Sequence, residues 1–341
     1  MKPRRLWTMT SKLAGFALSR VVVLTLLFAT LHATGEVAFE KTSKDMKIRI
    51  DGKPMATYVW SDEKTLRPYF ANVFAPNGMQ VTRIHPPDPV VNRDNSDHET
   101  MHPGIWLAFG EINGMDTWRN KARVRHIRFV AEPSFDGEQG TYTVLNAYEP
   151  LDGSKSNAIL ETCRYDIFAL DMGWFLLSQS VFRSNDGELR FGDQEEMGFG
   201  VRLNTPITVK YGTGAILNSE GGRNEYGTWG QRAKWCSFFG NTNDGVVGIT
   251  IMPGAENFRP SWFHSRDYGL VVANPFGKKA MTAADDTSVQ PDATTIPAGE
   301  PFRLTNAVYI FATKGAPDNA TAYDWFQELL AQSEAPEPAT P

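Results

Sequence analysis

The chain has 341 residues, of which 41% are hydrophobic and 12% aromatic, and its formal net charge is −5. This composition is typical of a globular protein with a sizeable core and argues against a disordered chain or a coiled coil. The acidic excess is mild, and no run of Lys and Arg follows the N-terminal region. Because binding to phosphates needs a concentrated positive field, these charges argue against a nucleic-acid partner.

Residues 1–33 have the pattern of a secretory signal peptide. The leader is basic and contains Lys2, Arg4, Arg5, Lys12 and Arg20. An apolar run from Val21 to Leu31 follows, and small residues stand at 33–35. This run is well short of the ~20 apolar residues that cross a bilayer. We therefore expect a cleaved signal, a secreted or periplasmic protein, and no membrane span in the mature chain.

Short runs of β-branched and aromatic residues dominate the rest of the chain and alternate with turns of Asn, Asp and Gly. Such runs occupy residues 46–50, 57–60, 104–110, 124–130, 140–148, 163–170, 174–182, 245–252 and 306–313. Residues 46–50 alternate apolar with polar, as in a strand with one wet face. Residues 174–182 are more continuously apolar, as in a strand covered on both faces. Strands without intervening helices predict an all-β fold, a large two-sheet antiparallel β-sandwich that forms one domain over 36–333.

Turns and one helix follow from the same pattern. The Asn-Asp-Gly segments at Asn185–Gly187 and Asn243–Gly245 predict hairpin turns. Residues 320–333 have apolar side chains at helical spacing and predict a C-terminal helix, with Asn319 or Thr321 as its cap. The proline-rich residues 334–341 predict a disordered tail.

Two cysteines, Cys163 and Cys236, lie in apolar and aromatic runs. An oxidising compartment would allow them to form one disulfide. Such surroundings also suit buried thiols, which pack as small apolar groups. We favour two buried thiols, although the sequence leaves the pairing open.

Histidines are concentrated in one proline-rich loop that contains His85, His98 and His102. Pro103 opposes the helix that a metalloprotease-type histidine pair needs. The three imidazoles could still converge on a divalent metal, with Asp97 behind them. We favour paired imidazoles that hold a hydroxylated ligand and exchange protons near neutral pH. The alternative is that one or two of these rings bond to buried loop carbonyls.

Aromatic and cationic residues follow this loop at Trp106, Trp118, Arg119 and Lys121. A ring beside fixed cations suits a sugar, because its C–H face stacks on the ring while polar groups bind its hydroxyls. A solvated basic strand edge would have the same composition. The sequence leaves both interpretations open.

Adjacent acids, Glu195 and Glu196, precede a glycine-rich strand. Neighbours on a strand point to opposite faces, so at most one of them faces a given site. Glu196 and Arg202 are separated by an even offset and share a face if the strand is unbroken. Gly198 and Gly200 permit a bulge that would break this relation.

A last polar segment contains His264, Arg266, Asp267 and Tyr268, and Trp229 adds a ring nearby in the sequence. In an extended segment His264 and Arg266 lie on one face and Asp267 on the other. The chain has no nucleophile elbow, P-loop or dinucleotide fingerprint, and no organic cofactor is expected.

Four motifs in the same order resemble a bacterial secreted family of unknown function that carries the label "methane oxygenase PmoA". They are D-H-E-T-M-H-P-G-I-W-L-A-F-G from Asp97, E-E-M-G-F-G-V-R from Glu195, W-G-Q-R-A-K-W-C from Trp229 and H-S-R-D-Y-G-L-V-V-A-N-P-F-G from His264. The resemblance runs from Arg67 to Phe311. A membrane methane monooxygenase subunit would need several apolar spans of ~20 residues, so the residues do not support that label. The family is similar in fold to the galactose-mutarotase-like supersandwich, which implies a large two-sheet β-architecture used by sugar epimerases, lyases and some glycosidases.

Together these observations predict a secreted carbohydrate-active protein, with a glycosidase, lyase or epimerase acting on a sugar or oligosaccharide as the favoured form. The expected acid–base groups are His98, His102, Glu196 and His264. Substrate contacts are expected from Trp106, Trp118, Arg119, Lys121, Arg202, Trp229, Arg266, Asp267 and Tyr268. Hydrolysis by a carboxylate pair would need a second acid about 5 to 9.5 Å from Glu196, and Asp267 is the candidate. The alternatives are a non-catalytic glycan-binding module and a loop-histidine metalloenzyme.

Overall fold

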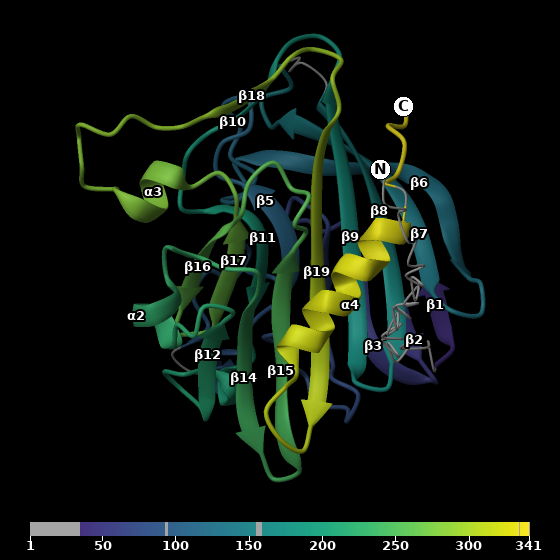
Figure 1. Cartoon of the computed structure of the whole chain (residues 1–341). Coiled ribbons are helices and arrows are strands. Elements are labelled where there is room, and N and C mark those ends of the chain that lie inside the picture. Colours follow the sequence, from purple (N-terminus) through teal and green to yellow (C-terminus); the bar gives the residue numbers. More distant parts are fainter. Residues whose placement is uncertain (1–34, 93–94, 155–158, 334, 341) are drawn as a thin grey trace, which may run out of the picture. The chain divides into compact units, whose positions relative to one another are not determined.

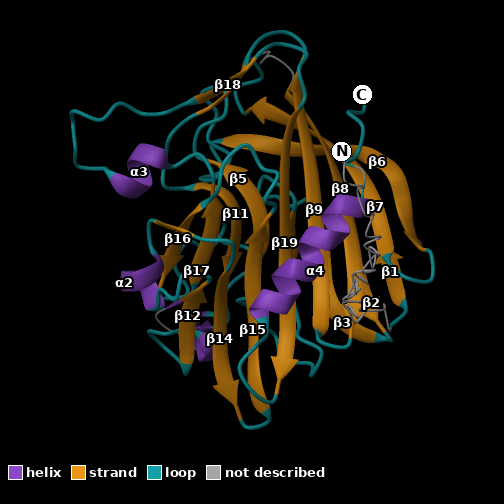
Figure 2. Ribbon diagram, in the orientation of Figure 1, coloured by secondary structure: helices purple, strands orange, loops and turns teal. Residues whose placement is uncertain are grey.

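A computed structural model of the chain describes residues 35–92, 95–154, 159–333 and 335–340 (Figure 1). The predicted signal peptide, residues 1–33, lies outside the described residues. Within them strands predominate, and the longest helix is the one near the C-terminus (Figure 2).

Two large antiparallel sheets contain most of the strands. In order across the first sheet, the nine strands are β1 (Val37–Lys41), β2 (Asp45–Ile50), β3 (Lys53–Val59), β4 (Tyr69–Ala71), β5 (Ile105–Phe109), β11 (Met197–Arg202), β17 (Leu270–Asn274), β16 (Trp262–Arg266) and β13 (Gln231–Arg232). In order across the second, the eight strands are β12 (Gly214–Asn218), β14 (Cys236–Thr242), β15 (Gly245–Pro253), β19 (Phe302–Thr313), β9 (Gly173–Ser184), β8 (Ile159–Leu170), β7 (Gly140–Pro150) and β6 (Ala122–Phe135). A separate ribbon pairs β10 (Leu189–Phe191) with β18 (Thr294–Ile296).

The two large sheets face each other across the main hydrophobic core. Phe199 and Val201 of β11 point into it from the first sheet, and Val144 of β7 and Leu176 of β9 point into it from the second. Alternate residues of β11 therefore face the core and the outside, as the period of a strand requires. Burial of each such side chain stabilises the fold by about 1.5–3 kcal/mol. The prediction of a large two-sheet antiparallel sandwich is confirmed.

Helix α4 (Asn319–Gln332) packs on the outer face of the second sheet (Figure 1). Tyr323 and Phe326 of this helix belong to a cluster with Phe175 and Tyr309 of the sheet. The helix thus covers the second face of β9, which explains why that strand is apolar on both sides. The predicted C-terminal helix is confirmed. The shorter helices are α1 (Pro89–Asn92), η2 (Thr205–Ile207), α2 (Asn224–Thr228) and α3 (Lys278–Thr282).

Three details of the chain's turns and caps test the sequence patterns. Asn243–Gly245 joins the paired strands β14 and β15, so that hairpin turn is confirmed. Asn185–Gly187 does not form a hairpin, because β10 pairs with β18 and not with β9. The expected caps Asn319 and Thr321 were wrong, since the helix is capped one residue earlier. The Asp318 carboxylate accepts a hydrogen bond from the backbone N–H of Thr321 at 3.0 Å.

Cys163 and Cys236 are both buried and unpaired, which confirms two thiols. Burial raises the pKa of the Cys163 thiol to about 12, so it is protonated and unreactive at neutral pH. Residues 335–340, in the stretch predicted to be a disordered tail, contact the second sheet. The backbone N–H of Ala339 donates a hydrogen bond to Thr162 Oγ1 at 2.8 Å.

A pair of glycines tests the packing of the first sheet. Gly198 has φ +111°, and a Cβ there would lie 2.1 Å from the Ala273 carbonyl oxygen on the neighbouring strand. Gly137 has a similar φ of +104°, but a Cβ there would meet nothing within 4 Å. We expect Gly137→Ala to lower the free energy of unfolding by about 1 kcal/mol through backbone strain alone. Gly198→Ala adds a steric overlap and should cost at least about 3 kcal/mol.

Chemical denaturation of the two variants beside the wild type measures both terms. Equal losses of stability in the two variants would show that β11 and β17 do not pack as closely as described.

Candidate functional site

The outer face of the first sheet brings several of the predicted site residues together. Strand register places Tyr69, Trp106, Gly200, Val272 and His264 opposite one another in one row across β4, β5, β11, β17 and β16. Residues that are directly opposite in antiparallel strands point to the same face. The side chains in this row therefore share the face that points away from the core.

A second row lies one step along the same strands. Arg202 of β11 and Arg266 of β16 both pair with Leu270 of β17, so the two arginines flank it on the outer face. Strands are spaced about 4.8 Å apart, so the two Cα atoms are separated by roughly 10 Å. The turn between β16 and β17 holds Tyr268, whose ring centroid lies 4.3 Å from the Arg202 guanidinium carbon. Tyr268 follows Arg266 of β16, and its ring reaches across β17 to the Arg202 side chain of β11.

A stack of rings rises from the first row. The Trp106 indole lies over Gly200, where a Cβ would be only 2.8 Å from the ring. His102 stacks on Trp106 with centroids 5.3 Å apart, and His98 stacks on His102 at 4.8 Å. Trp118 meets Trp106 edge-on at 5.4 Å. The glycine leaves room for the base of a stack whose top ring, His98, reaches the surface.

We call residues 95–102 the histidine loop. Arg202 joins the ring stack to Asp97 in this loop. Its side chain is fully buried, and it donates hydrogen bonds to His102 Nδ1 at 3.0 Å and to the Asn95 and Asp97 Oδ1 atoms at 2.5 Å each. A buried guanidinium needs such partners because desolvation of an unpaired charge costs several kcal/mol. Arg202 therefore fixes the position of both His102 and Asp97.

Two further buried arginines hold the backbone of the same loop. Arg83 donates to the carbonyl oxygens of Asn95, Asp97, His98 and His102 at 2.6 to 3.3 Å.

Arg67 donates to the Met101, Thr117 and Trp118 carbonyls from the other side. Burial lowers the pKa of both Arg67 and Arg83 to about 9, which still leaves them charged at neutral pH.

Asp97 and His98 form a hydrogen-bonded dyad at the surface. Asp97 Oδ2 lies 2.5 Å from His98 Nδ1, while its other oxygen accepts from Arg202. Burial raises the pKa of Asp97, but the His98 and Arg202 contacts outweigh it and hold that pKa well below its usual range. An ionised carboxylate at Nδ1 fixes the tautomer in which Nε2 carries the lone pair. The His98 side chain is 38% exposed, so its Nε2 can be reached by a ligand and could accept a proton from it.

The backbone at His98 is unusual as well. Its φ is +51°, in the left-handed region that non-glycine residues rarely adopt. The carbonyl bonds from Arg83 hold the loop in this conformation. Strained residues of this kind occur preferentially at functional sites.

His102 has a different role from His98. It is 2% exposed, and burial, reinforced by Arg202, lowers its pKa well below the ordinary value. Because Nδ1 accepts from Arg202, the proton sits on Nε2, which has no partner among the described residues. His102 is therefore a neutral ring that positions His98.

A second polar cluster lies at the far end of the first row. His264 Nε2 is 3.0 Å from Glu195 Oε1 and 3.1 Å from Arg266 Nε. Nε2 donates to Glu195 if it carries the ring proton and accepts from Arg266 if it does not. Arg266 also donates to Glu195 and, at 2.9 Å, to Glu225. Trp229 Nε1 donates to Glu195 Oε1 at 3.3 Å. Burial lowers the pKa of His264 to about 4, so the ring is neutral at pH 7.

The turn that carries Tyr268 is held by carboxylates. Asp267 Oδ1 accepts from the Glu225 backbone N–H at 2.8 Å, and Glu225 Oε2 accepts from the Asp267 N–H at 3.0 Å. Burial raises the pKa of Tyr268, whereas the positive charges of Arg202 and Arg266 lower it. Tyr268 therefore lies within the field of both clusters. We call Asp97, His98, His102, Glu195, Arg202, His264, Arg266 and Tyr268 together the outer-face site.

The remaining predicted residues have other partners. Glu196 pairs with Arg119, which also bonds to Asp116, and Lys121 lies 3.8 Å from Asp116. Glu196 therefore does not meet Arg202, because the strand begins only after it, at Met197.

Trp106 and Trp118 are 1% and 0% exposed, so they support the ring stack from below and offer no open face. His85 packs edge-on against Tyr69 at 4.9 Å, away from the His98–His102 stack. Among the described residues, no group of three His, Cys, Asp or Glu side chains is placed to hold a metal ion.

Two members of the outer-face site, Asp97 and Glu195, were not among the residues expected from the sequence as acid–base groups or substrate contacts. The same holds for three residues that bond to the site or to its loop: Arg67, Arg83 and Glu225. Arg83 has no acidic residue within four positions in the sequence, so no local pattern indicates its partners. Glu195 was considered beside Glu196, but its carboxylate meets His264 and Arg266, which are distant in the sequence, so no local pattern selects it.

This arrangement defines a two-sheet β-sandwich with a histidine–carboxylate–arginine site on one outer face. The sequence matches a family of unknown function, DUF6807, over residues 45–324, and the chain belongs to that family. No curated protein matches it.

Two solved structures are similar to this chain in fold. One is galactose 1-epimerase from Lactobacillus acidophilus NCFM, with 10% identity, 83% of this chain and 100% of that chain covered, and a TM-score of 0.40. The other is a galactose mutarotase-like protein from Clostridium acetobutylicum, with 10% identity, 83% and 99% covered, and a TM-score of 0.37. In the described part of the chain, no helix has the length and apolar character needed to cross a membrane.

The Arg202 contacts predict a large effect of substitution. Arg202→Gln removes a buried charge and leaves Asp97 and His102 without their donor, so we expect a loss of at least about 3 kcal/mol in the free energy of unfolding. Arg190→Gln is the matched control, since Arg190 pairs with Glu111 at the surface, and it should cost at most about 1 kcal/mol. Urea denaturation measures both. A loss below about 1 kcal/mol for Arg202→Gln would contradict the role given to this side chain.

The neutral buried histidine predicts a pH dependence. Because the folded state holds the pKa of His264 near 4 and the unfolded chain near 6.5, the unfolded state binds more protons between these values. The free energy of unfolding should therefore fall as the pH is lowered from 6.5 to 4. His264→Gln should reduce this slope, measured by denaturation at pH 7, 5.5 and 4. An unchanged slope in the variant would mean that folding does not change the pKa of His264.

Proposed function

We propose that the protein is a secreted carbohydrate-active protein that binds a sugar or oligosaccharide at the outer-face site and exchanges a proton with it through His98. The observation that carries this proposal is the Asp97–His98 dyad, an oriented and partly exposed imidazole whose Nε2 is available to a ligand. Nearby groups suit a polyhydroxylated substrate, because Arg266, Glu195 and Tyr268 offer donors and acceptors on the same face.

Proton transfer by histidine is better supported than hydrolysis by two carboxylates. Hydrolysis needs a carboxylic acid and a free carboxylate on either side of the bond that breaks. Here Glu195 and Glu225 are bound by Arg266, and Glu196 is bound by Arg119. Asp267 is engaged with the Glu225 backbone. We therefore favour an epimerase or lyase type of reaction.

In such a reaction His98 Nε2 takes a proton from the sugar, and the Asp97 carboxylate stabilises the imidazolium that forms. The Tyr268 hydroxyl, near Arg202 and Arg266, is the candidate to return a proton on the other side. The positive charge of Arg266, which is 29% exposed, would stabilise negative charge that develops on the substrate.

The test is a screen of oligosaccharides and monosaccharides by mass spectrometry and NMR, with wild type, His98→Gln and Asp97→Asn. We expect both variants to lower turnover by at least about 100-fold. Asp136→Asn is the matched control, because the Asp136 carboxylate is also hydrogen-bonded, to two backbone N–H groups, but lies in the β6–β7 turn. Its turnover should equal that of the wild type.

Three outcomes would decide against the proposal. If no saccharide binds or is converted, the carbohydrate assignment fails. If saccharides bind but no product forms in any variant, the protein is a glycan-binding module. If turnover survives His98→Gln, the base lies elsewhere. Export is tested separately by N-terminal sequencing of the protein recovered outside the cytoplasm, where a new N-terminus near residue 34 is expected.

A further inference from the structure

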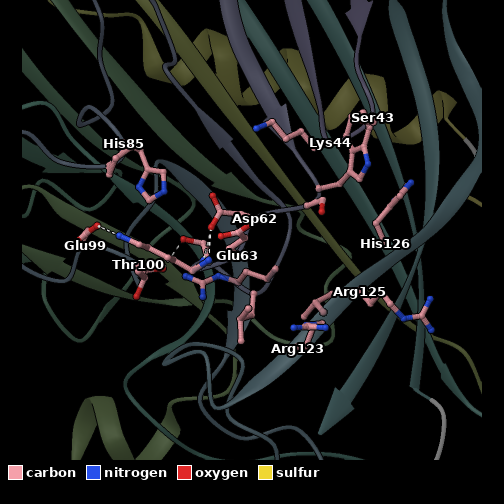
Figure 3. Close-up of a pocket in the computed structure, with 18 residues that line it drawn as sticks. Ser43, Lys44, Asp62, Glu63, His85, Glu99, Thr100, Arg123, Arg125 and His126 are labelled. Carbon is pink, nitrogen blue, oxygen red and sulfur yellow. Dashed lines mark hydrogen bonds and ion pairs between the residues drawn. The ribbon is translucent and has the colours of Figure 1, made fainter. Parts of the chain in front are cut away.

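A cavity of about 940 Å³ lies where the edge strand β6 of the second sheet passes the β3–β4 loop of the first (Figure 3). The segments that line it are residues 43–44, 60–67, 85–86, 99–100 and 123–126. Its volume falls within the range of ligand sites for small molecules, at the upper end. The histidine loop contributes to both sites, because His98 faces Asp97 and Arg202 while Glu99 and Thr100 line this cavity.

The charges in this cavity are unevenly distributed. The lining contains five basic residues, Lys44, Lys64, Arg67, Arg123 and Arg125, and three acidic ones, Asp62, Glu63 and Glu99. Figure 3 shows Arg123, Arg125 and His126 on one side, and His85, Glu99 and Thr100 on the other. The wall formed by residues 123–126 of β6 thus contains two arginines and no acidic residue.

Two of these cations are free to take a ligand. Lys64 lies 3.5 Å from Glu99, and Arg125 donates to Glu149 at 2.6 Å. Lys44 and Arg123, by contrast, form no ion pair with any carboxylate of the described residues. An anionic group that enters the cavity would complete them without breaking an existing pair.

An aromatic platform stands beside these cations. The Trp60 indole is held by His126 at 5.6 Å and by Phe129 at 5.3 Å between ring centroids, and it remains partly exposed to the cavity. Rigid rings of this kind cover the apolar C–H face of a sugar. His85 and His126 add neutral ring nitrogens, because burial lowers the pKa of both, that of His85 to about 4. Neutral donors and acceptors suit hydroxyl groups.

We propose that this cavity binds a saccharide that carries a carboxylate, with Lys44 and Arg123 on the carboxylate, Trp60 against the sugar ring and His85 on its hydroxyls. This cavity is a second site and its proposal does not rest on the outer-face site. Its proposed ligand contacts take no part in the proton transfer through His98; they are Lys44, Arg123, Trp60 and His85.

The test is isothermal titration calorimetry of the full chain with trigalacturonate and with its methyl ester, a pair in which esterification removes the negative charges and adds only methyl groups. We expect the acid to bind at least about tenfold more tightly than the ester. Arg123→Gln should weaken binding of the acid about tenfold and leave the ester unchanged. Trp60→Leu should weaken both probes. Thermal melting first confirms that each variant is folded.

Arg128→Gln is the control, because Arg128 lies on the same strand but outside the cavity lining. It should bind both probes as the wild type does. The proposal is overturned if neither probe binds, if the ester binds as tightly as the acid, or if Arg128→Gln has the effect expected of Arg123→Gln. The third probe is a trisaccharide that carries sulfate groups and no carboxylate, and tighter binding of it than of the acid would overturn the carboxylate assignment.

Discussion

The buried guanidinium of Arg202 is the contact on which the outer-face site depends. A charge in this position needs hydrogen-bond acceptors, and those that Nη1 and Nη2 find come from the histidine loop: His102, Asn95 and Asp97. The loop is therefore held against the end of β11. Asp97 is held by the same contact, and it orients His98 in turn. The buried Arg202 thus fixes Asp97, and Asp97 fixes the exposed His98 imidazole.

Strand register does the rest of the assembly. Residues as distant in the chain as Trp106 and His264 share one face because β5, β11, β17 and β16 pair in antiparallel register. Gly200 lies between them in the row and leaves space for the indole that supports the ring stack. The strand spacing of the sheet thus sets the separation between the Arg202 cluster and the Arg266 cluster, and Tyr268 lies between them.

Much of this could be read from local sequence patterns, since alternation, continuous apolar runs and helical spacing report which faces are covered. The β-sandwich, the strands and the C-terminal helix follow from such patterns. The histidine loop and the segment from His264 to Tyr268 are visible in the sequence because polar and ionisable residues cluster there. What a local pattern does not contain is the partner of each group. The choice of Glu195 over Glu196 depends on where β11 begins, and the burial of Trp106 and Trp118 depends on packing between strands. The cavity beside β6 could not be predicted from local patterns for the same reason, because its walls come from separate parts of the chain.

The four carbonyl contacts of Arg83 have a consequence for any ligand of the histidine loop. A loop that must become ordered on binding loses conformational entropy at that moment, which weakens the affinity. Here residues 95–102 are tied to a guanidinium before a ligand arrives, so that loss has already occurred during folding. The proposed sugar ligand of His98 would lose mainly its own freedom of movement, because the imidazole is already held in a preorganised geometry.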